Sequence, residues 1–147
     1  MDDVRWKQRY SNYTNILKIL KSSVINKDPN EFSELEKIGF AKSFELCFEL
    51  LWKLLKDFLE YEEIETDLIS PKNILKISAS SGLLEKTEAN GDILMQAHKC
   101  RNELVHIYDF DKFSAALADI KNLYLEEFKK IDDFFRNMIM VTVNDDG

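Results

Sequence analysis

The sequence is poor in the residues that make tight turns, with 4 glycines and 2 prolines among its 147 residues. Folds built from β-strands need more of these residues, because each strand is followed by a turn. Hydrophobic residues make up 45% of the chain and charged residues 32%, a balance that suits long amphipathic helices. We therefore predict an all-α protein that buries one core and forms one domain.

Positive charge is also in deficit, since the formal net charge is -7 at pH 7. A general nucleic-acid binder needs an excess of lysine and arginine to neutralise phosphate groups. DNA is therefore not an expected partner, and any contact with RNA or with a nucleotide has to be local and limited to one site.

The sequence contains no apolar run of the length that crosses a membrane. Its most apolar stretch, residues 48–59, is interrupted by four charged residues. The first three residues are acidic in character and lack the apolar core of a secretion signal. These features predict a cytoplasmic protein with no membrane partner.

Cysteine is scarce too, with 2 residues in the chain. Cys47 and Cys100 are far apart, and neither belongs to a Cys-x-x-Cys pair. This spacing predicts reduced thiols rather than a disulfide framework or a structural zinc site. His98 precedes His106 by eight residues, which is no recognised metal spacing, and we expect it to be a partly buried polar residue. The sequence thus predicts neither a metal nor a cofactor.

The periodicity of a helical bundle is what the sequence does contain. Apolar residues recur at spacings of three and four in successive segments. Capping signals mark where helices begin: Asp28, Pro29 and Glu31 before the second, and Ser70-Pro71 before the third. The predicted helices cover 4–24, 29–61, 71–82, 92–107, and a last segment from Asp109 or Asp111 to about 137.

These segments predict an up-and-down bundle of four or five helices over residues 1–137, followed by a tail, 138–147, that is flexible or lies in an oligomer contact. An unbroken helix over 29–61 would be roughly 50 Å long, which is long for a domain of this size. A kink or a separate first turn is therefore expected around residues 37–39. Residues 85–91 are predicted to be a polar connection.

The most chemically distinctive segment is residues 101–108, at the end of the fourth predicted helix. Asn102 and His106 are four apart and so share one helical face. Arg101, Val105 and Tyr108 share the adjacent face. An arginine holds a phosphate with two hydrogen bonds, and histidine exchanges a proton near neutral pH. The set suits metal-free cleavage of an RNA phosphodiester, with His106 moving a proton and Arg101 stabilising the charged transition state.

A structural role explains the same residues. Arg101 would pair with Glu103 or Asp109, and His106 would lie near the negative end of the helix dipole. Spacing alone favours this explanation, because structural ion pairs are common. Catalysis also needs two proton carriers, which a two-fold dimer with this helix at its interface would supply from two copies of the chain.

The segment Arg101-Asn102-x-x-x-His106-x-Tyr108 resembles the Arg-x4-His-x-Tyr signature of the HEPN superfamily of helical bundles. Within that superfamily, the chain is similar to the branch called nucleotidyltransferase substrate-binding proteins. Residues 44–53 resemble the Phe-Glu…Glu-Leu-x-Trp-Lys helix of this branch. Two shorter segments, Ser70-Pro71-Lys72 and Tyr108-Asp109, also match, in the expected order over about residues 4–135.

The resemblance implies a homodimer that is the substrate-binding subunit of a separate, minimal nucleotidyltransferase. In the toxin-like half of such toxin–antitoxin modules, the arginine and histidine of two subunits cut RNA, and the partner silences them by AMPylation of the tyrosine. Carried over, Arg101 and His106 are catalytic and Asn102 orients them. Tyr108 is the modified residue. Leu-Val at 104–105 replaces residues that are small and polar in many members, which leaves the sub-branch open.

Two function classes therefore remain open, and they do not exclude each other. One is an interaction module that presents a substrate, or Tyr108 itself, to a nucleotidyltransferase. The other is a metal-independent endoribonuclease that this partner restrains. The chain is not expected to be a nucleotidyltransferase itself. Asp109-Phe110-Asp111 has the D-x-D spacing of those enzymes, but the Gly-Ser turn and the strand that carry it are missing, so helix capping explains Asp109 and Asp111.

Supporting residues of the site are expected on the second predicted helix. Glu45 and Glu49 are one turn apart, and two explanations stay open. Glu49 pairs with Lys53 at the surface, or one of the two glutamates faces inward and pairs with Arg101, because glutamate is rarely buried unpaired. Trp52 is most simply a core residue, and Asp109 completes the supporting set.

Overall fold

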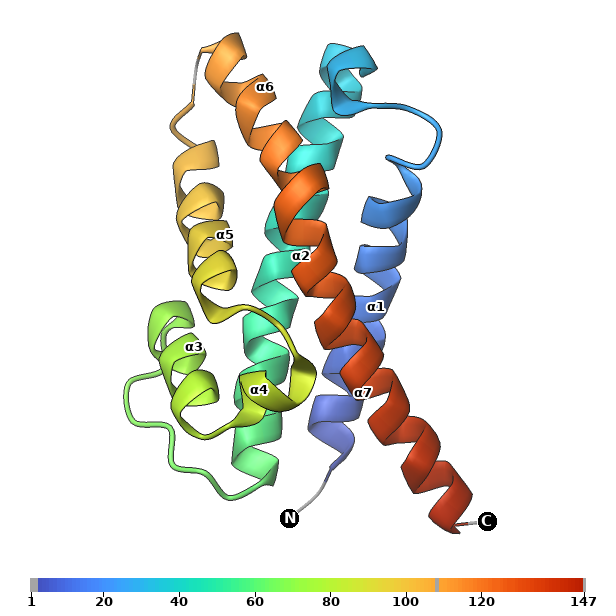
Figure 1. Cartoon of the computed structure of the whole chain (residues 1–147), viewed down its shortest axis with the longest axis vertical. Coiled ribbons are helices and arrows are strands. Elements are labelled where there is room, and N and C mark those ends of the chain that lie inside the picture. Colours follow the sequence, from blue (N-terminus) through green and yellow to red (C-terminus); the bar gives the residue numbers. More distant parts are fainter. Residues whose placement is uncertain (1–2, 108, 147) are drawn as a thin grey trace.

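The computed structural model describes residues 3–107 and 109–146, and within these ranges the chain forms helices and no strand. The all-α prediction is confirmed, with more helices than the four or five expected. In chain order they are α1 (Val4–Ser22), η1 (Pro29–Glu31), α2 (Glu34–Tyr61), α3 (Pro71–Ser80), α4 (Leu83–Thr87), α5 (Gly91–Leu104), α6 (Phe110–Asp119), η2 (Ile120–Tyr124) and α7 (Leu125–Asp146). The long helices lie side by side as a bundle (Figure 1).

Helix α2 is the central element of the bundle. Its 28 residues span about 42 Å, and it packs against α1, α3, α5 and α6. The helix runs without a break through Gly39, but the expected alternative, a separate first turn, is present earlier in the chain as η1. The physical reason is that α2 begins later than predicted, at Glu34, which shortens it to a length that the domain accommodates.

The start of α2 is set by Ser33 rather than by Asp28. The Ser33 hydroxyl accepts a hydrogen bond from the backbone N–H of Glu36 (3.1 Å), and the Glu36 carboxylate accepts one from the backbone N–H of Ser33 (2.9 Å). Asp28 instead caps the short 3-10 helix η1 through the N–H of Asn30. Asp28 and Pro29 therefore begin a helical turn as predicted, but that turn is η1, and the capping box that begins α2 lies five residues further on.

The segment between α3 and α5 is more helical than predicted. Ser70 accepts from the N–H of Asn73 (3.2 Å), which confirms the predicted cap of α3. Gly82, with φ of +87°, then reverses the chain. Residues 83–87 form α4 where a polar connection was expected, because Leu83 and Leu84 are buried and favour a turn of helix over an exposed loop.

The last quarter of the chain is one long, continuous helix made of α6, the π-helical turn η2, and α7 (Figure 1). It continues to Asp146, so the predicted end at Asn137 is wrong. The physical reason is the lack of a stop signal, because Gly147 is the first glycine or proline after residue 137. The proposed role of residues 138–147 as a flexible tail or an interface stays a prediction.

Two polar contacts position the helices around the site. The Tyr13 hydroxyl of α1 donates to the backbone carbonyl of Phe128 in α7 (2.6 Å). The buried carboxylate of Glu127 accepts from the backbone N–H of Asn90 (2.7 Å), the residue that caps α5. Within the described residues, no helix combines the length and the apolar character that a membrane span requires.

Candidate functional site

Helix α5 ends earlier than its sequence predicts. Its last residue is Leu104, and the N–H groups of His106 and Ile107 bond to carbonyls three residues back (2.9 and 3.4 Å), as in a tightened final turn. His106 thus lies beyond the helix, and its ideal four-residue register with Asn102 is lost. The predicted helix over 92–107 is wrong in its last turn, where β-branched Val105 and Ile107 flank His106.

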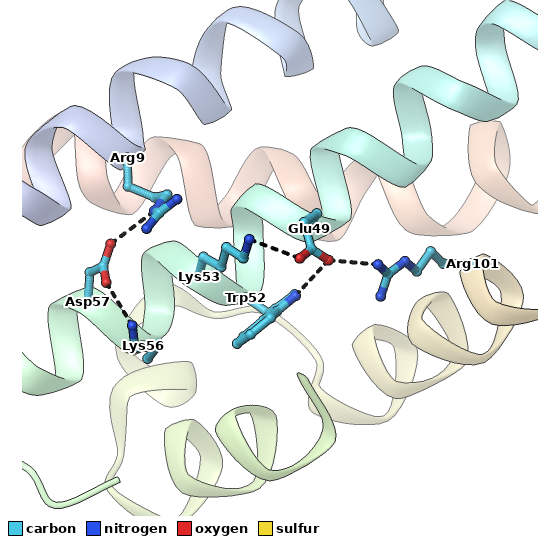
Figure 2. Close-up of polar contacts among 7 residues, drawn as sticks. All are labelled: Arg9, Glu49, Trp52, Lys53, Lys56, Asp57 and Arg101. Atoms are coloured by element: carbon cyan, nitrogen blue, oxygen red, sulfur yellow. Dashed lines mark hydrogen bonds and ion pairs between the residues drawn. The ribbon is translucent and has the colours of Figure 1, made fainter. Parts of the chain in front are cut away.

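Arg101 is held by a carboxylate of another helix. Its Nη2 donates to Oε2 of Glu49 on α2 at 2.7 Å (Figure 2). The indole N–H of Trp52 donates to the same oxygen at 3.0 Å, and the Lys53 ammonium lies 3.1 Å from Oε1. Both explanations for Glu49 are therefore confirmed together, since it pairs with Lys53 and also with Arg101.

The electrostatics of Glu49 follow from these contacts. Partial burial by itself favours the neutral acid, but the hydrogen bonds from Trp52 and Lys53 and the charge of Arg101 outweigh it and lower the pKa of Glu49. Glu49 is therefore ionised at neutral pH. With both side chains about 30% exposed, the pair lies at the edge of the core and not in it.

Other predicted pairings of the site turn out differently. Glu103 lies 4.0 Å from Lys99 instead of pairing with Arg101. Glu45 pairs with Lys42 at 3.8 Å. The Asp109 carboxylate accepts from the backbone N–H of Asp111 at 2.8 Å, which confirms that it caps α6.

A buried aromatic ring links the motif residues of α5. Phe48 is fully buried, and the Arg101 guanidinium carbon lies 5.9 Å from its ring centroid. The imidazole of His98 stacks on the same ring, with centroids 5.6 Å apart and planes at 26°. The side-chain amide nitrogen of Asn102 is 3.2 Å from Nε2 of His98. His98 is partly buried, as predicted, but it also belongs to the site.

Two surface grooves meet at Asn102. The first, here called the Arg101 groove, encloses about 490 Å³, and Arg101, Glu45 and Glu49 line it together with the exposed apolar Leu46 and Val105. The second, the α5–α6 groove, encloses about 1300 Å³. Its lining includes the residues Lys72, His98, Lys99, Glu103, His106, Asp109, Lys112 and Asp119.

Arg101 and His106 therefore open onto different grooves, while Asn102 lines both. A phosphodiester that contacts both side chains would have to lie across Asn102. His106 is exposed, and the third motif residue, Tyr108, lies outside the described residues. Asn102 is thus the motif residue that the two grooves share, and its orienting role stays a prediction.

Sequence reasoning missed Lys72 and Lys112 as lining residues, because they come from α3 and α6 and carry no local signal of proximity to α5. Trp52 is 8% exposed, which confirms its place in the core, but its indole N–H also orients Glu49. Among the described residues, no group of three or more histidine, cysteine or acidic side chains has the geometry to hold a metal ion.

The two thiols differ in their place, because Cys100 lines the α5–α6 groove and Cys47 lines neither groove. Cys47 is buried and free, and Cys100 is partly buried and free. Burial raises the pKa of the Cys100 thiol to about 12, so it is protonated at neutral pH.

Comparison with known proteins gives one match. Residues 8–137 match a protein-family model described as nucleotidyltransferase substrate binding protein like. The match covers the central helix α2, the motif segment of α5 and most of α7. No curated protein is similar enough to the chain to count as a relative.

Proposed function

Because the chain belongs to the nucleotidyltransferase substrate binding protein-like family, we propose that it is the helical partner of a separate, minimal nucleotidyltransferase. The observation that carries this proposal is the family match, which extends over residues 8–137 and so includes the motif at 101–108. The partner acts on Tyr108, which is the motif residue with the nucleophilic hydroxyl.

The reaction at Tyr108 is nucleotidyl transfer from ATP. The phenolic oxygen forms a bond to the α-phosphorus, the bond to the departing pyrophosphate breaks, and the phenolic proton passes to a base. In the sequence Tyr108 stands between His106 and Asp109, and both of these residues are exposed. A partner enzyme approaching the connection between α5 and α6 therefore meets an accessible segment of the chain.

A second candidate function, cleavage of RNA, is favoured by the arrangement of Arg101, Asn102 and His106. Glu49 engages Nη2 of Arg101, and an arginine has five N–H donors, so others are available to a phosphate. His106 removes the proton from a ribose 2′-hydroxyl, whose oxygen attacks the phosphorus. The 5′-oxygen leaves with a proton from a second acid, and a 2′,3′-cyclic phosphate results.

The second proton carrier comes from another copy of the chain. His98 is stacked on Phe48 and bonded to Asn102. It lies about 9 Å of helix rise before the end of α5 at Leu104, and His106 lies beyond that end, so we do not expect one phosphodiester to contact both imidazoles. A two-fold homodimer that brings two His106 side chains together removes this difficulty, and exposed Leu46 and Val105 beside Arg101 supply apolar surface for it.

The two functions combine into the toxin-like half of a toxin–antitoxin module. An AMP group on Tyr108 adds negative charge and bulk two residues from His106, so it repels an RNA phosphate and blocks the groove. The nucleotidyltransferase then acts as the antitoxin. This combination explains why a nucleotidyltransferase partner and an Arg–His pair occur with the same chain.

The partnership is tested by incubating the purified chain with the nucleotidyltransferase encoded beside it, Mg²⁺ and ATP. We expect a stable complex and, by mass spectrometry, the mass of AMP on the peptide that contains Tyr108, with no addition to a Tyr108→Phe variant. Unmodified Tyr108 after this incubation would overturn the proposed modification. The absence of any complex would overturn the partnership.

The RNase candidate is tested in cells that express the chain alone. We expect growth arrest with the wild-type chain and normal growth with a His106→Ala variant at equal protein level. Equal growth of the two strains would exclude RNA cleavage by this residue.

A further inference from the structure

Lys72 is a motif residue that the proposed reactions leave without a role. It is the third residue of Ser70-Pro71-Lys72, in which Ser70 caps α3 and Pro71 begins it. This arrangement places Lys72 in the first turn of α3 at the α5–α6 groove, which it lines together with His98 and Asn102. Helix α3 packs against α5, so the first turn of α3 lies beside the motif helix.

The charge of Lys72 is not balanced by a neighbour. It is exposed, and in the described part of the chain its ammonium forms no ion pair. Arg101, the other cation near His98, is balanced by Glu49 at 2.7 Å. Lys72 therefore adds an unbalanced positive charge to the lining of the α5–α6 groove.

The pKa of the His98 imidazole is sensitive to this positive charge. Partial burial, then the charges of Arg101 and Lys72, lower the pKa of His98. Both side chains are positively charged, so a bound anion would offset their effect on the pKa of His98. With Asn102 donating to Nε2, the neutral ring carries its proton on Nδ1 and has an N–H to donate.

The acidic residues that line the groove have other neighbours than Lys72. Asp119 and Glu103 contribute to raising the pKa of Cys100 and of Tyr124, after burial. Glu103 lies within 4.0 Å of Lys99. Asp109 caps α6. None of these acidic side chains pairs with Lys72 in the described part of the chain.

We propose that Lys72, His98 and the side-chain amide of Asn102 form a phosphate-binding subsite. It binds a phosphate ester of the RNA, next along the strand from the phosphodiester that His106 acts on, because His98 lies about 9 Å of helix rise before the end of α5 at Leu104 and His106 lies beyond that end. The identification of the ligand as RNA rests on the proposed function. The phosphate chemistry itself rests on the geometry of the groove.

Nuclear magnetic resonance of the two imidazoles tests this subsite. The chain has 2 histidines, so an untagged sample gives two imidazole signals, and a His106→Ala variant assigns them. Inorganic phosphate, AMP and a 2′-O-methyl oligoribonucleotide that resists cleavage are titrated in turn. We expect each probe to raise the pKa of His98 saturably, because the bound anion favours the imidazolium.

Lys72→Ala is the decisive variant, and Lys76→Ala is its matched control. Lys76 is exposed on the same helix, one turn away, and does not line the groove. Lys72→Ala should raise the pKa of His98 in the free protein and weaken phosphate binding by about tenfold, the loss of one charge-assisted hydrogen bond. Lys76→Ala should change neither quantity.

The probes also separate the two sources of phosphate. Tighter binding of the oligonucleotide than of AMP supports an RNA strand, and equal binding supports a single nucleotide at the same subsite. A His98 signal that is insensitive to every probe, or equal losses from the two lysine variants, overturns the subsite. If the nucleotidyltransferase still binds and modifies the chain in that case, the subsite has failed while the proposed function stands.

Discussion

Arg101 and Glu49 are joined across the bundle by a 2.7 Å contact between Nη2 and Oε2, although 52 positions separate them in the chain. Glu49 also accepts from Trp52, so the carboxylate is fixed from two sides (Figure 2). The arginine of the motif is consequently oriented by the helix that carries the Phe-Glu…Trp-Lys stretch. The Arg101 groove is a property of α2 and α5 together.

Glu49→Gln should destabilise the protein by about 0.5–1 kcal/mol at pH 7, because the amide keeps the shape of the carboxylate but loses its charge, and the pair is partly exposed to solvent. The pKa of Glu49 is lowered from 4.5 in the folded state. Its charge therefore stabilises the fold above pH 4.5, and this contribution is lost as the pH falls through the folded-state pKa. Urea denaturation at several pH values measures the difference.

The matched control for this series is Glu45→Gln, which changes the same charge one turn away on α2. It should cost less, because its contact with Lys42 is 3.8 Å long and the lysine is largely exposed. A difference between wild type and Glu49→Gln that is as large at pH 3 as at pH 7 would contradict the electrostatic explanation.

Asp57→Asn tests a buried contact far from the grooves. Asp57 is 3% exposed and accepts from Nε of Arg9 at 3.0 Å, with Lys56 at 3.5 Å (Figure 2). The substituted side chain has no negative charge, and its amide N–H group would face the cations Arg9 and Lys56. We therefore expect a loss of about 1–3 kcal/mol in the free energy of unfolding. Asp67→Asn, in an exposed loop position, should change it little. Equal effects of the two variants would argue against the Arg9 contact.

Gly39→Ala should stabilise the protein by about 0.5–1 kcal/mol. Gly39 lies inside α2, and no atom outside its own helix lies within 4 Å of the added methyl group. Alanine therefore lowers the entropy of the unfolded chain at no steric cost. Gly82→Ala is the opposite case, because φ is +87° there, and it should destabilise by about 1 kcal/mol. Thermal unfolding of both variants measures these changes in stability. A melting temperature of Gly39→Ala below that of the wild type would refute the prediction for Gly39.

Arg101→Lys separates charge from geometry in the RNase candidate. Lysine keeps the charge but lacks the planar fork that bonds Glu49 and a phosphate at the same time. Cleavage of a model RNA should fall by about 10- to 100-fold, the equivalent of one charge-assisted hydrogen bond. The same exchange in reverse at Lys76, Lys76→Arg, is the control, because Lys76 is exposed and lines neither groove, and it should leave the rate unchanged. A fully active Arg101→Lys enzyme would show that the guanidinium is not needed.

Local rules predicted the elements of this bundle well. The predicted apolar face of the first helix consists of Trp6, Tyr10, Tyr13, Leu17, Leu20 and Val24; the first five are buried, and Val24 lies after the end of α1 and is partly buried. Ser70 before α3 and Asp109 before α6 cap their helices as predicted, because a cap depends only on residues within three positions. The ends of helices were harder to predict. Leu104 ends α5 without a glycine, and α7 continues to Asp146.

By itself, the sequence determined that the chain is helical, that 101–108 carries the candidate chemistry, and which pairings were open to Glu49. Periodicity and capping act over a few residues and can be read along the chain. Only the tertiary structure decided that Glu49 pairs with Arg101, that the ring of His98 stacks on Phe48, and that Lys72 lines the α5–α6 groove. These contacts join α2, α3 and α5 across the bundle, and they depend on how the buried faces pack rather than on any spacing within one helix.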